Sequence, residues 1–390
     1  MKVAIVGGSL GGLTAACLLR DAGHEVSVYE RSPVRLEQRG AGIGFLPETY
    51  RYLVNRAKVD LTRISIATHH IRYLNRAGEI VHDAAHNYLF SSWNTVYSST
   101  LQHFGLDEYH LCSEMNSFIQ QGRKVTIKFV DRPSVECDLM VAADGISSQS
   151  RSNLATGGSS NYSGYVAWRG MIPESSLDPK VVELFGDAIT YFVYPHSHIL
   201  IYPIPDHEGR VTIGDRLINF VWYRNYASGS EFDSLMLDKS GVKRDISIPP
   251  GQVSKVNVEQ MHFEARRDMP TVIAELICAT TEPFVQVIYD LDIDQMVFGR
   301  VCLLGDAAII ARPHAAAGTA KAAADGWALV EALSTHAEVD DALNSYQTKQ
   351  LAVGKNLLAR TRRVGEKSQF LNSWDPNDPE VIFGLHKPGN

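Results

Sequence analysis

Residues 2–31 carry the feature that most constrains the fold of this chain. The stretch KVAIVGGSLGGLTAACLLRDAGHEVSVYER reads as a strand (3–6), a glycine-rich turn, a helix and a second strand (26–29). Glycines at such a turn allow a pyrophosphate to approach the helix N-terminus, and an acid at the end of the second strand binds a ribose hydroxyl. Glu30 stands at that position, 18 residues after Gly12. The pattern predicts an adenine-dinucleotide site; a tight strand–helix turn without a ligand is the alternative.

Ser9 departs from this fingerprint, because the middle position of the motif is usually glycine. A serine fits there if its φ angle is negative, although the approach of a diphosphate is then slightly less close. The unit alone leaves NAD and FAD both open. Its candidate dinucleotide-binding residues are Gly7, Ser9, Leu10, Gly12, Glu30 and Arg31.

Two later segments each place an acidic residue after an apolar strand. The stretch CDLMVAADGISSQSR (137–151) runs into Asp144, and RVCLLGDAAIIARPHAAAG (300–318) runs into Asp306. Ligands of open α/β sheets lie at the carboxyl ends of the strands, so both acids are expected there. A helix of small residues follows Gly318, and the N–H groups at its start form a ready anion site. A small-residue helix that simply packs closely on a sheet is the alternative.

These three motifs, in this order, resemble those of the FAD-dependent aromatic hydroxylases, the single-component flavoprotein monooxygenases, and they span residues 3–326. GGSLGG, GYVAWRG and GDAAIIARPHAAAG are most similar to the 2,6-dihydroxypyridine hydroxylase branch of that family. The resemblance implies that Asp306 binds the ribityl chain of FAD, that the isoalloxazine ring lies beside residues 312–318, and that RGAGIGFLPET (39–49) passes close to it. The further cofactor-binding residues that it implies are Arg39, Gly42, Asp144, Gly145, Gly305, Asp306, Pro313, Ala317 and Gly318.

Two departures from the family pattern concern the same cofactor. Ile309 stands where a histidine often follows the GDAA motif, so this position cannot donate a hydrogen bond. An arginine that is common in the helix around YSSTLQHFG is absent, and Ser98 and Ser99 occupy that neighbourhood. We therefore expect Arg39 or Arg151 to meet the charge of the diphosphate.

The resemblance implies a monooxygenase in which NADH or NADPH reduces FAD and dioxygen forms a flavin C4a-hydroperoxide. The distal oxygen then attacks a small hydroxylated aromatic or N-heteroaromatic ring, of the dihydroxypyridine kind. The sequence contains neither a Ser-His-Asp order nor a metal spacing such as H-E-x-x-H, which favours a reaction carried by the cofactor and predicts no metal site. Candidate acid–base groups are His314, Tyr202 and His196, together with His198, which shares a strand face with His196 if that strand is regular.

Two other functions remain open from the sequence. One is a flavin-dependent dehydrogenase or oxidase on the same fold, which differs in that no oxygen atom enters the product. The other is a non-catalytic flavoprotein-like binding protein, which the retained Asp-Gly and Gly-Asp pairs disfavour.

The motifs and the strand patterns between them predict a mixed α/β fold with discontinuous domains. A Rossmann-like FAD-binding domain is expected from 1–70, 98–155 and 281–340. Short aromatic and β-branched segments predict an antiparallel-sheet substrate domain from 71–97 and 156–280. A C-terminal helical segment and tail follow at 341–390.

Composition restricts the partners and the compartment. The formal net charge of −7 and the pI near 6.1 argue against nucleic-acid binding, which normally requires a basic face. The five cysteines are scattered and odd in number, as expected for a reduced, cytoplasmic protein. No signal peptide or membrane span is expected. The expected partners are a small aromatic substrate and dioxygen, and a homodimer is left open.

Overall fold

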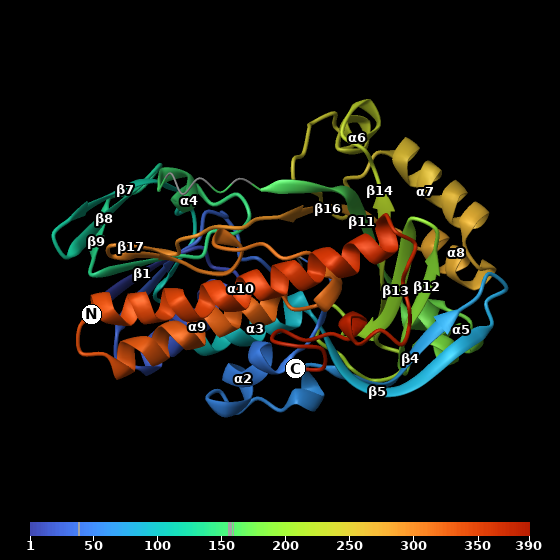
Figure 1. Cartoon of the computed structure of the whole chain (residues 1–390), viewed down its shortest axis with the longest axis horizontal. Helices are drawn as coiled ribbons and strands as arrows, with labels where there is room; N and C mark the ends of the chain where they lie inside the picture. The colour runs from blue at the N-terminus through green and yellow to red at the C-terminus, as the bar shows by residue number, and fades with distance from the viewer. Residues whose placement is uncertain (38–39, 155–157, 159) are drawn as a thin grey trace.

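The computed structural model describes residues 1–37, 40–154, 158 and 160–390. Figure 1 shows two sheet-based regions side by side, with the long helix α10 (Val339–Gln369) running beside both of them. The fold is of the mixed α/β class that the sequence predicts.

A six-stranded sheet forms the region that contains the N-terminal motif. Strands β18, β10, β1, β2 and β6 run parallel in that order, and β17 is antiparallel at the edge beside β18. Strands β1, β10 and β18 are almost continuously buried and apolar, as is typical of parallel strands with both faces covered. The bounds of the strands are β1 (Lys2–Val6), β2 (Glu25–Tyr29), β6 (Tyr109–His110), β10 (Leu139–Ala142), β17 (Val297–Phe298) and β18 (Val301–Leu303).

Helices cover this sheet, and α1 contacts both α3 and α9. A three-stranded sheet, in the order β7–β8–β9, lies at the outer end of the region (Figure 1). The helices are α1 (Leu10–Asp21), α2 (Pro47–Asn55), α3 (Trp93–Phe104), α4 (Gln149–Asn153) and α9 (Gly318–Thr335), with the 3-10 turns η1 (Leu61–Arg63), η3 (Gly305–Ala307) and η4 (Pro313–Ala315). The small sheet consists of β7 (Met115–Gln121), β8 (Lys124–Phe129) and β9 (Val135–Cys137).

The second region is a nine-stranded sheet in the order β15–β16–β11–β14–β13–β12–β4–β5–β3. Its pairs are antiparallel except for β12 with β4. The strands are β3 (Gly42–Gly44), β4 (Ile66–Leu74), β5 (Ile80–Ser92), β11 (Asn161–Pro173), β12 (Ala188–Tyr194), β13 (Ser197–Ile204), β14 (Leu217–Asn225), β15 (Ser247–Ile248) and β16 (Phe284–Asp290). The helices of this region are α5 (Pro179–Phe185), α6 (Ser230–Leu235), α7 (Lys255–Asp268) and α8 (Thr271–Cys278), with η2 (Glu174–Ser176) beside them.

Side-chain alternation along the central strands divides this sheet into two apolar faces. On β13, Ile199 and Ile201 pack into a core shared with α7 and α8. Leu200 and Tyr202 point to the opposite face, where they join a cluster that includes Ala315, Ala317, Ala320 and Phe383. Because successive strand residues face opposite sides, one strand both builds a core and walls a cavity.

The domain boundaries expected from the sequence need correction at three places. The expected FAD-binding segments ended at 70 and resumed at 281, but β4 and β16 lie wholly in the nine-stranded sheet. The segment IATHHIRYL forms β4, which pairs with β5 on one side and with β12 on the other. Its polar residues did not indicate a strand in the interior of a sheet. The expected substrate segment ran to 97, whereas α3 begins at Trp93 and packs against α1. Among the helices of the described ranges, none combines the length and the apolar character needed to cross a membrane.

Candidate active site

The turn between β1 and α1 brings backbone close to backbone. Gly7 has a φ of +107°, and a Cβ there would lie 2.3 Å from the carbonyl oxygen of Ala143. A Cβ on Gly12 would lie 2.0 Å from the carbonyl oxygen of Gly7. Ser9 is the N-cap of α1 with a φ of −78°, and its side chain makes no capping hydrogen bond. The serine is therefore unstrained, and the first N–H groups of the helix are left for a ligand.

Glu30 lies at the end of β2, beside this helix start. Its carboxylate accepts hydrogen bonds from the N–H groups of Gly8 and Ser32, each at 2.8 Å, and it is only 6% exposed. A hollow of about 530 Å³ opens along the turn, and its lining includes Gly7, Ser9, Glu30, Arg31, Asp144, Gly145 and Ile146. We call this hollow the nucleotide groove. Leu10 and Gly12 stand behind it, buried in the first turn of α1.

Asp144 and Arg151 have structural partners that the sequence did not reveal. The Asp144 carboxylate accepts hydrogen bonds from Ser148 Oγ (2.6 Å) and from the N–H of Ser150 (2.9 Å), and so holds the start of α4. Arg151 donates to the carbonyl oxygens of Ile146 (2.7 Å) and Ala307 (2.9 Å). Arg151 is outside the lining of the nucleotide groove, so its expected role at a diphosphate is not supported. Arg39, the other candidate, lies outside the described residues.

A buried ion pair fixes the Gly305–Asp306 turn. Lys321 Nζ lies 2.9 Å from the Asp325 carboxylate, and the two side chains are 1% and 0% exposed. Lys321 also donates to the carbonyl oxygen of Gly305 (3.1 Å), while Asp325 accepts from the N–H of Gly305 (2.8 Å). Burial of two charges is costly unless each finds partners, and here Lys321 donates to two oxygens while Asp325 also accepts from the Gln350 side chain (2.6 Å). Sequence reasoning missed both residues, although a Lys–Asp pair four positions apart within AAAGTAKAAADG was a usable signal.

The fixed turn presents Asp306 to a second hollow of about 260 Å³, between η4 and the nine-stranded sheet. The Asp306 side chain is exposed to this hollow. The protein that surrounds the hollow removes solvent from the carboxyl group and raises its pKa, with Lys321 acting in the opposite direction. We call the hollow the ring cavity. Its lining includes the predicted site residues Gly42, Tyr202, Asp306, Pro313, His314, Ala317 and Gly318. The ring cavity and the nucleotide groove share Ile146 and Ile246, so they can hold one extended ligand.

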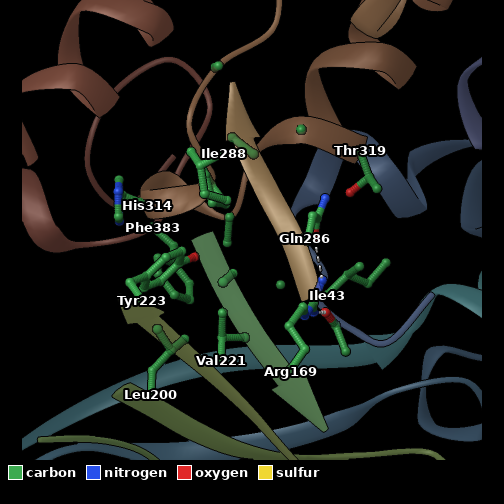
Figure 2. Close-up of a pocket in the computed structure, with 18 of the residues that line it drawn as sticks. Ile43, Arg169, Leu200, Val221, Tyr223, Gln286, Ile288, His314, Thr319 and Phe383 are labelled. Carbon is green, nitrogen blue, oxygen red and sulfur yellow. Dashed lines mark hydrogen bonds between the residues drawn. The ribbon is translucent and has the colours of Figure 1, made fainter. Parts of the chain in front are cut away.

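His314 is buried at the wall of the ring cavity (Figure 2). Its Nε2 lies 2.8 Å from the hydroxyl oxygen of Tyr165, which comes from β11. Its Nδ1 has no hydrogen-bond partner among the residues that the structure describes. Burial lowers the pKa of His314 well below its usual value, and the nearby His198 and Arg312 lower it further. The imidazole is therefore neutral around pH 7.

The sequence suggested that His196 and His198 lie on one face of a regular strand, but the structure does not place them so. His196 occupies the turn before β13 with a φ of +61°, and its ring nitrogen Nδ1 lies 3.2 Å from the carbonyl oxygen of Gln369. It lies outside the described lining of the ring cavity. His198 does line the cavity, and burial lowers its pKa to about 3. The positive φ at the turn breaks the alternation on which the expectation depended.

The opposite end of the ring cavity holds an arginine that the sequence reading did not select. Arg169 on β11 donates to the carbonyl oxygen of Gly42 (2.6 Å) and to Gln286 (3.3 Å), a bond visible in Figure 2. Tyr202 also lines the cavity and stacks on Phe90 with ring centroids 4.2 Å apart. Burial raises the pKa of Tyr202, so its hydroxyl stays protonated. An arginine inside the apolar strand GYVAWRGMI was the available signal.

Two family models match the chain. One, described as FAD binding domain, covers residues 1–213 and 289–361, and one described as FAD binding domain-like covers 162–290. The chain belongs to this family of FAD-dependent monooxygenases. It is an enzyme of the aromatic hydroxylase kind, with FAD as its cofactor.

Individual relatives of this chain make the comparison more specific than the family models do. The chain is 35% identical to the 2,6-dihydroxypyridine 3-monooxygenase of Paenarthrobacter nicotinovorans, over 99% of this chain and 96% of that protein. It is 24% identical to a salicylate hydroxylase of Pseudomonas putida, over 85% and 76% of the two chains. The solved structure of 2,6-dihydroxypyridine-3-hydroxylase from Arthrobacter nicotinovorans matches with a TM-score of 0.94 over 100% and 98% of the two chains, at 35% identity. Klebsiella pneumoniae HpxO, complexed with FAD and uric acid, shares the fold at a TM-score of 0.77 and 21% identity, over 98% and 90% of the chains. The resemblance drawn from the motifs is confirmed.

The residues of the two hollows fit FAD. The turn at Gly7 and Gly12 excludes any side chain, and the start of α1 offers uncapped N–H groups of the kind that bind a diphosphate. Glu30 offers a buried acceptor within the nucleotide groove. Asp306 lines the ring cavity, with its acidic group open to that hollow. These groups match in kind a diphosphate, a ribose and a polyhydroxyl chain.

Proposed function

We propose that this chain hydroxylates a small, flat, hydroxylated N-heteroaromatic ring of the dihydroxypyridine kind, using FAD, dioxygen and either NADH or NADPH. The observation that carries the proposal is the ring cavity: an aromatic-walled space of about 260 Å³ that adjoins the nucleotide groove. It offers Arg169 at one end and the neutral His314 at another (Figure 2). The relative of known activity, which is 35% identical, acts on 2,6-dihydroxypyridine.

Nine of the residues named from the sequence are proposed to hold the cofactor. Gly7, Ser9 and Glu30 bind its adenosine diphosphate end in the nucleotide groove, with Gly12 allowing the turn. The remaining five of these residues, Gly42, Asp306, Pro313, Ala317 and Gly318, face its flavin end in the ring cavity. Bound FAD supplies the reduction of dioxygen and the transfer of one oxygen atom to the ring.

His314 is proposed as the group that accepts the proton of a ring hydroxyl. In the tautomer that carries its proton on Nε2, His314 donates to the Tyr165 oxygen, and Nδ1 is an acceptor. A buried nitrogen without a partner costs free energy. A ring hydroxyl that reaches Nδ1 when the His314 side chain turns toward the cavity would recover that cost. Removing a proton from the hydroxyl raises the electron density of the ring, which an electrophilic oxygen requires. Tyr202 is proposed to orient the ring through its protonated hydroxyl.

The remaining walls of the ring cavity exclude water and hold a bound ring in one plane of the cavity. Leu200, Val221 and Ile288 are buried apolar residues on three strands, and all three line the cavity (Figure 2). An apolar wall strengthens each polar contact made inside the cavity. These side chains therefore favour a flat aromatic ring with few polar groups over a larger or charged molecule.

The test is a screen of NADH and NADPH oxidation across hydroxylated pyridines and phenols, with product and hydrogen peroxide measured together. We expect coupled product formation with a dihydroxypyridine, and one oxygen atom from labelled dioxygen in the product. Label from water, or oxidation without oxygen insertion, would contradict the proposal and favour a dehydrogenase or oxidase.

A cytoplasmic location is part of this proposal. All five cysteines lie within the described residues and are free thiols, which agrees with a reducing compartment. Fractionation of the source cells with an antibody would test it. The homodimer that the sequence left open is tested by sedimentation of the FAD-loaded protein.

A further inference from the structure

The C-terminal segment of the chain separates the ring cavity from another hollow. This outer hollow has a volume of about 350 Å³, and its lining includes Tyr73, Val81, Val193, Tyr194, Lys367 and Trp374. Trp374 lines the ring cavity as well. One side chain therefore stands between two spaces, each large enough for a small aromatic ring.

Contacts on both sides place Trp374 as a partition. Toward the ring cavity, its ring lies 4.8 Å from the ring of His198 and 5.9 Å from that of Tyr191, measured between centroids. On the outer side, its Nε1 donates to the hydroxyl of Tyr73 at 3.2 Å. Tyr73 in turn stacks on Tyr191, with centroids 4.9 Å apart. The partition is thus made of aromatic faces and a single side-chain hydrogen bond, which is a weak restraint.

The segment that carries Trp374 is irregular and is held at both ends. It is also held just before Trp374, where Asn372 accepts a hydrogen bond from the His196 N–H (2.7 Å) and the Ser373 N–H donates to the carbonyl oxygen of Lys367 (2.9 Å). It leaves α10 after Gln369 and reaches η5 (Pro379–Val381). Lys367, in the last turn of α10, pairs with Asp378 and, at 2.9 Å, with Glu380. A side chain on a loop held in this way can rotate while the backbone on either side stays in place. A rotation of Trp374 needs only the loss of its hydrogen bond and ring contacts.

We propose that the outer hollow is the entry site for the aromatic substrate and that Trp374 is its gate into the ring cavity. The inference rests on the proposed function. FAD that fills the nucleotide groove covers the side of the ring cavity that is continuous with that groove, so a ring that arrives later enters elsewhere. The outer hollow offers the aromatic faces of Tyr73, Tyr194 and Trp374, which suit a flat N-heteroaromatic molecule.

A blocked route has a kinetic signature that a damaged binding site lacks. A side chain that obstructs the path, but does not touch the bound ligand, slows association and dissociation by the same factor. The equilibrium dissociation constant is then unchanged. A residue that contacts the bound ligand changes that constant, mostly through the dissociation rate.

Val81→Trp is the variant that obstructs the path. Val81 is 63% exposed at the outer hollow, so the fold accommodates a larger side chain there. The FAD-loaded, oxidised enzyme is mixed with 2,6-dihydroxypyridine without NADH or NADPH, and the flavin absorbance is followed by stopped flow. We expect both rate constants to fall by about tenfold, within the range over which association rates vary among variants, with the dissociation constant unchanged. Ile80→Trp is the matched control, because Ile80 is the neighbouring residue, is 45% exposed and lies outside the described lining of the outer hollow.

Tyr73→Phe is the variant that loosens the gate. It removes the acceptor of the Trp374 hydrogen bond while leaving a ring to stack on Tyr191. We expect both rate constants to rise by a few fold, in line with the loss of about one hydrogen bond. Wild-type rate constants in Val81→Trp would overturn the route while leaving the proposed function intact. Absence of any absorbance change with the wild-type enzyme would overturn the proposed substrate, and this inference with it.

Discussion

The nucleotide groove of the six-stranded region and the ring cavity beside the nine-stranded sheet are formed by different kinds of groups. In the nucleotide groove the main elements are backbone: two glycines that exclude a Cβ and a helix start without a side-chain cap. In the ring cavity they are side chains, contributed by β11, β13, β14, β16 and η4. The first site depends on spacing along one short segment, and the second depends on packing between distant segments.

This difference predicts opposite sensitivities to mutation. The nucleotide groove should not tolerate an added carbon atom where two backbones meet, whatever its chemistry. The ring cavity should tolerate small changes of volume but not the loss of a particular hydrogen-bonding group. Each variant below tests one side of this comparison.

The largest effect is expected for Gly12→Ala. The new Cβ would lie 2.0 Å from the carbonyl oxygen of Gly7, so the turn must open and the proposed diphosphate site is lost. We expect colourless protein that FAD does not reconstitute, measured as the ratio of flavin to protein absorbance. Gly23→Ala is the control, because no heavy atom lies within 4 Å of its added carbon, although its φ of +86° makes the variant less stable by about 1–2 kcal/mol. Retention of FAD by Gly12→Ala would contradict the backbone account.

His314→Gln tests the side-chain half of the comparison. If His314 accepts the hydroxyl proton, product formation should fall by about 10²–10⁴-fold while the FAD content stays normal. NADH or NADPH oxidation should then yield hydrogen peroxide, and a higher pH should partly restore coupling as the substrate ionises unaided. Tyr165→Phe is the companion variant, since it removes only the partner of Nε2 at 2.8 Å. Full coupling in His314→Gln at neutral pH would refute the assignment.

A smaller loss is expected for the two acidic side chains that are proposed to bind the cofactor, one at each end of the site. Glu30→Ala and Asp306→Ala each remove one acceptor, which we propose binds the adenosine ribose and the ribityl chain, respectively. A charge-assisted hydrogen bond contributes about 1.5–3 kcal/mol, so FAD affinity should fall by roughly 10- to 100-fold in each variant. Titration of the apoprotein with FAD measures both. Unchanged affinity in both variants would mean that other groups hold the cofactor.

The same comparison explains what the sequence could predict. Glycine spacing and an acid after each strand are local signals, so Gly7, Glu30 and Asp306 could be found before the fold was known. Arg169, Tyr165 and the Lys321–Asp325 pair gain their roles only when strands and helices meet in space. The wrong expectation for His196 has a related cause, because His196 itself has a left-handed backbone conformation and so does not continue the strand face. A site formed by the backbone of one short segment can be predicted from the sequence of that segment. A site formed by side chains from distant segments cannot.

Acidification should lower the free energy of unfolding of the protein, because a buried histidine of the ring cavity disfavours protonation. Burial lowers the pKa of folded His198 to about 3, whereas an unfolded histidine titrates near 6.5. The unfolded chain therefore binds the proton more strongly, and stability that is complete above about pH 6.5 is lost as the pH falls toward 3. At pH 5 the loss from this one group is about 2 kcal/mol. Urea unfolding at pH 7 and pH 5 should show that His198→Gln loses less stability than wild type; equal losses would contradict the assignment.

The smallest effect is expected for Ser9→Gly, which restores the usual glycine of the motif. Ser9 has an extended backbone with a φ of −78°, open to any residue, and its side chain caps nothing. The exchange therefore relieves no strain and removes no hydrogen bond of the free protein, and serine and glycine at an N-cap differ by only a few tenths of a kcal/mol. FAD affinity, measured by titration of the apoprotein, should change by less than about threefold. A tenfold gain would show that the Ser9 side chain obstructs the diphosphate, and the nucleotide groove would then depend on side chains as the ring cavity does.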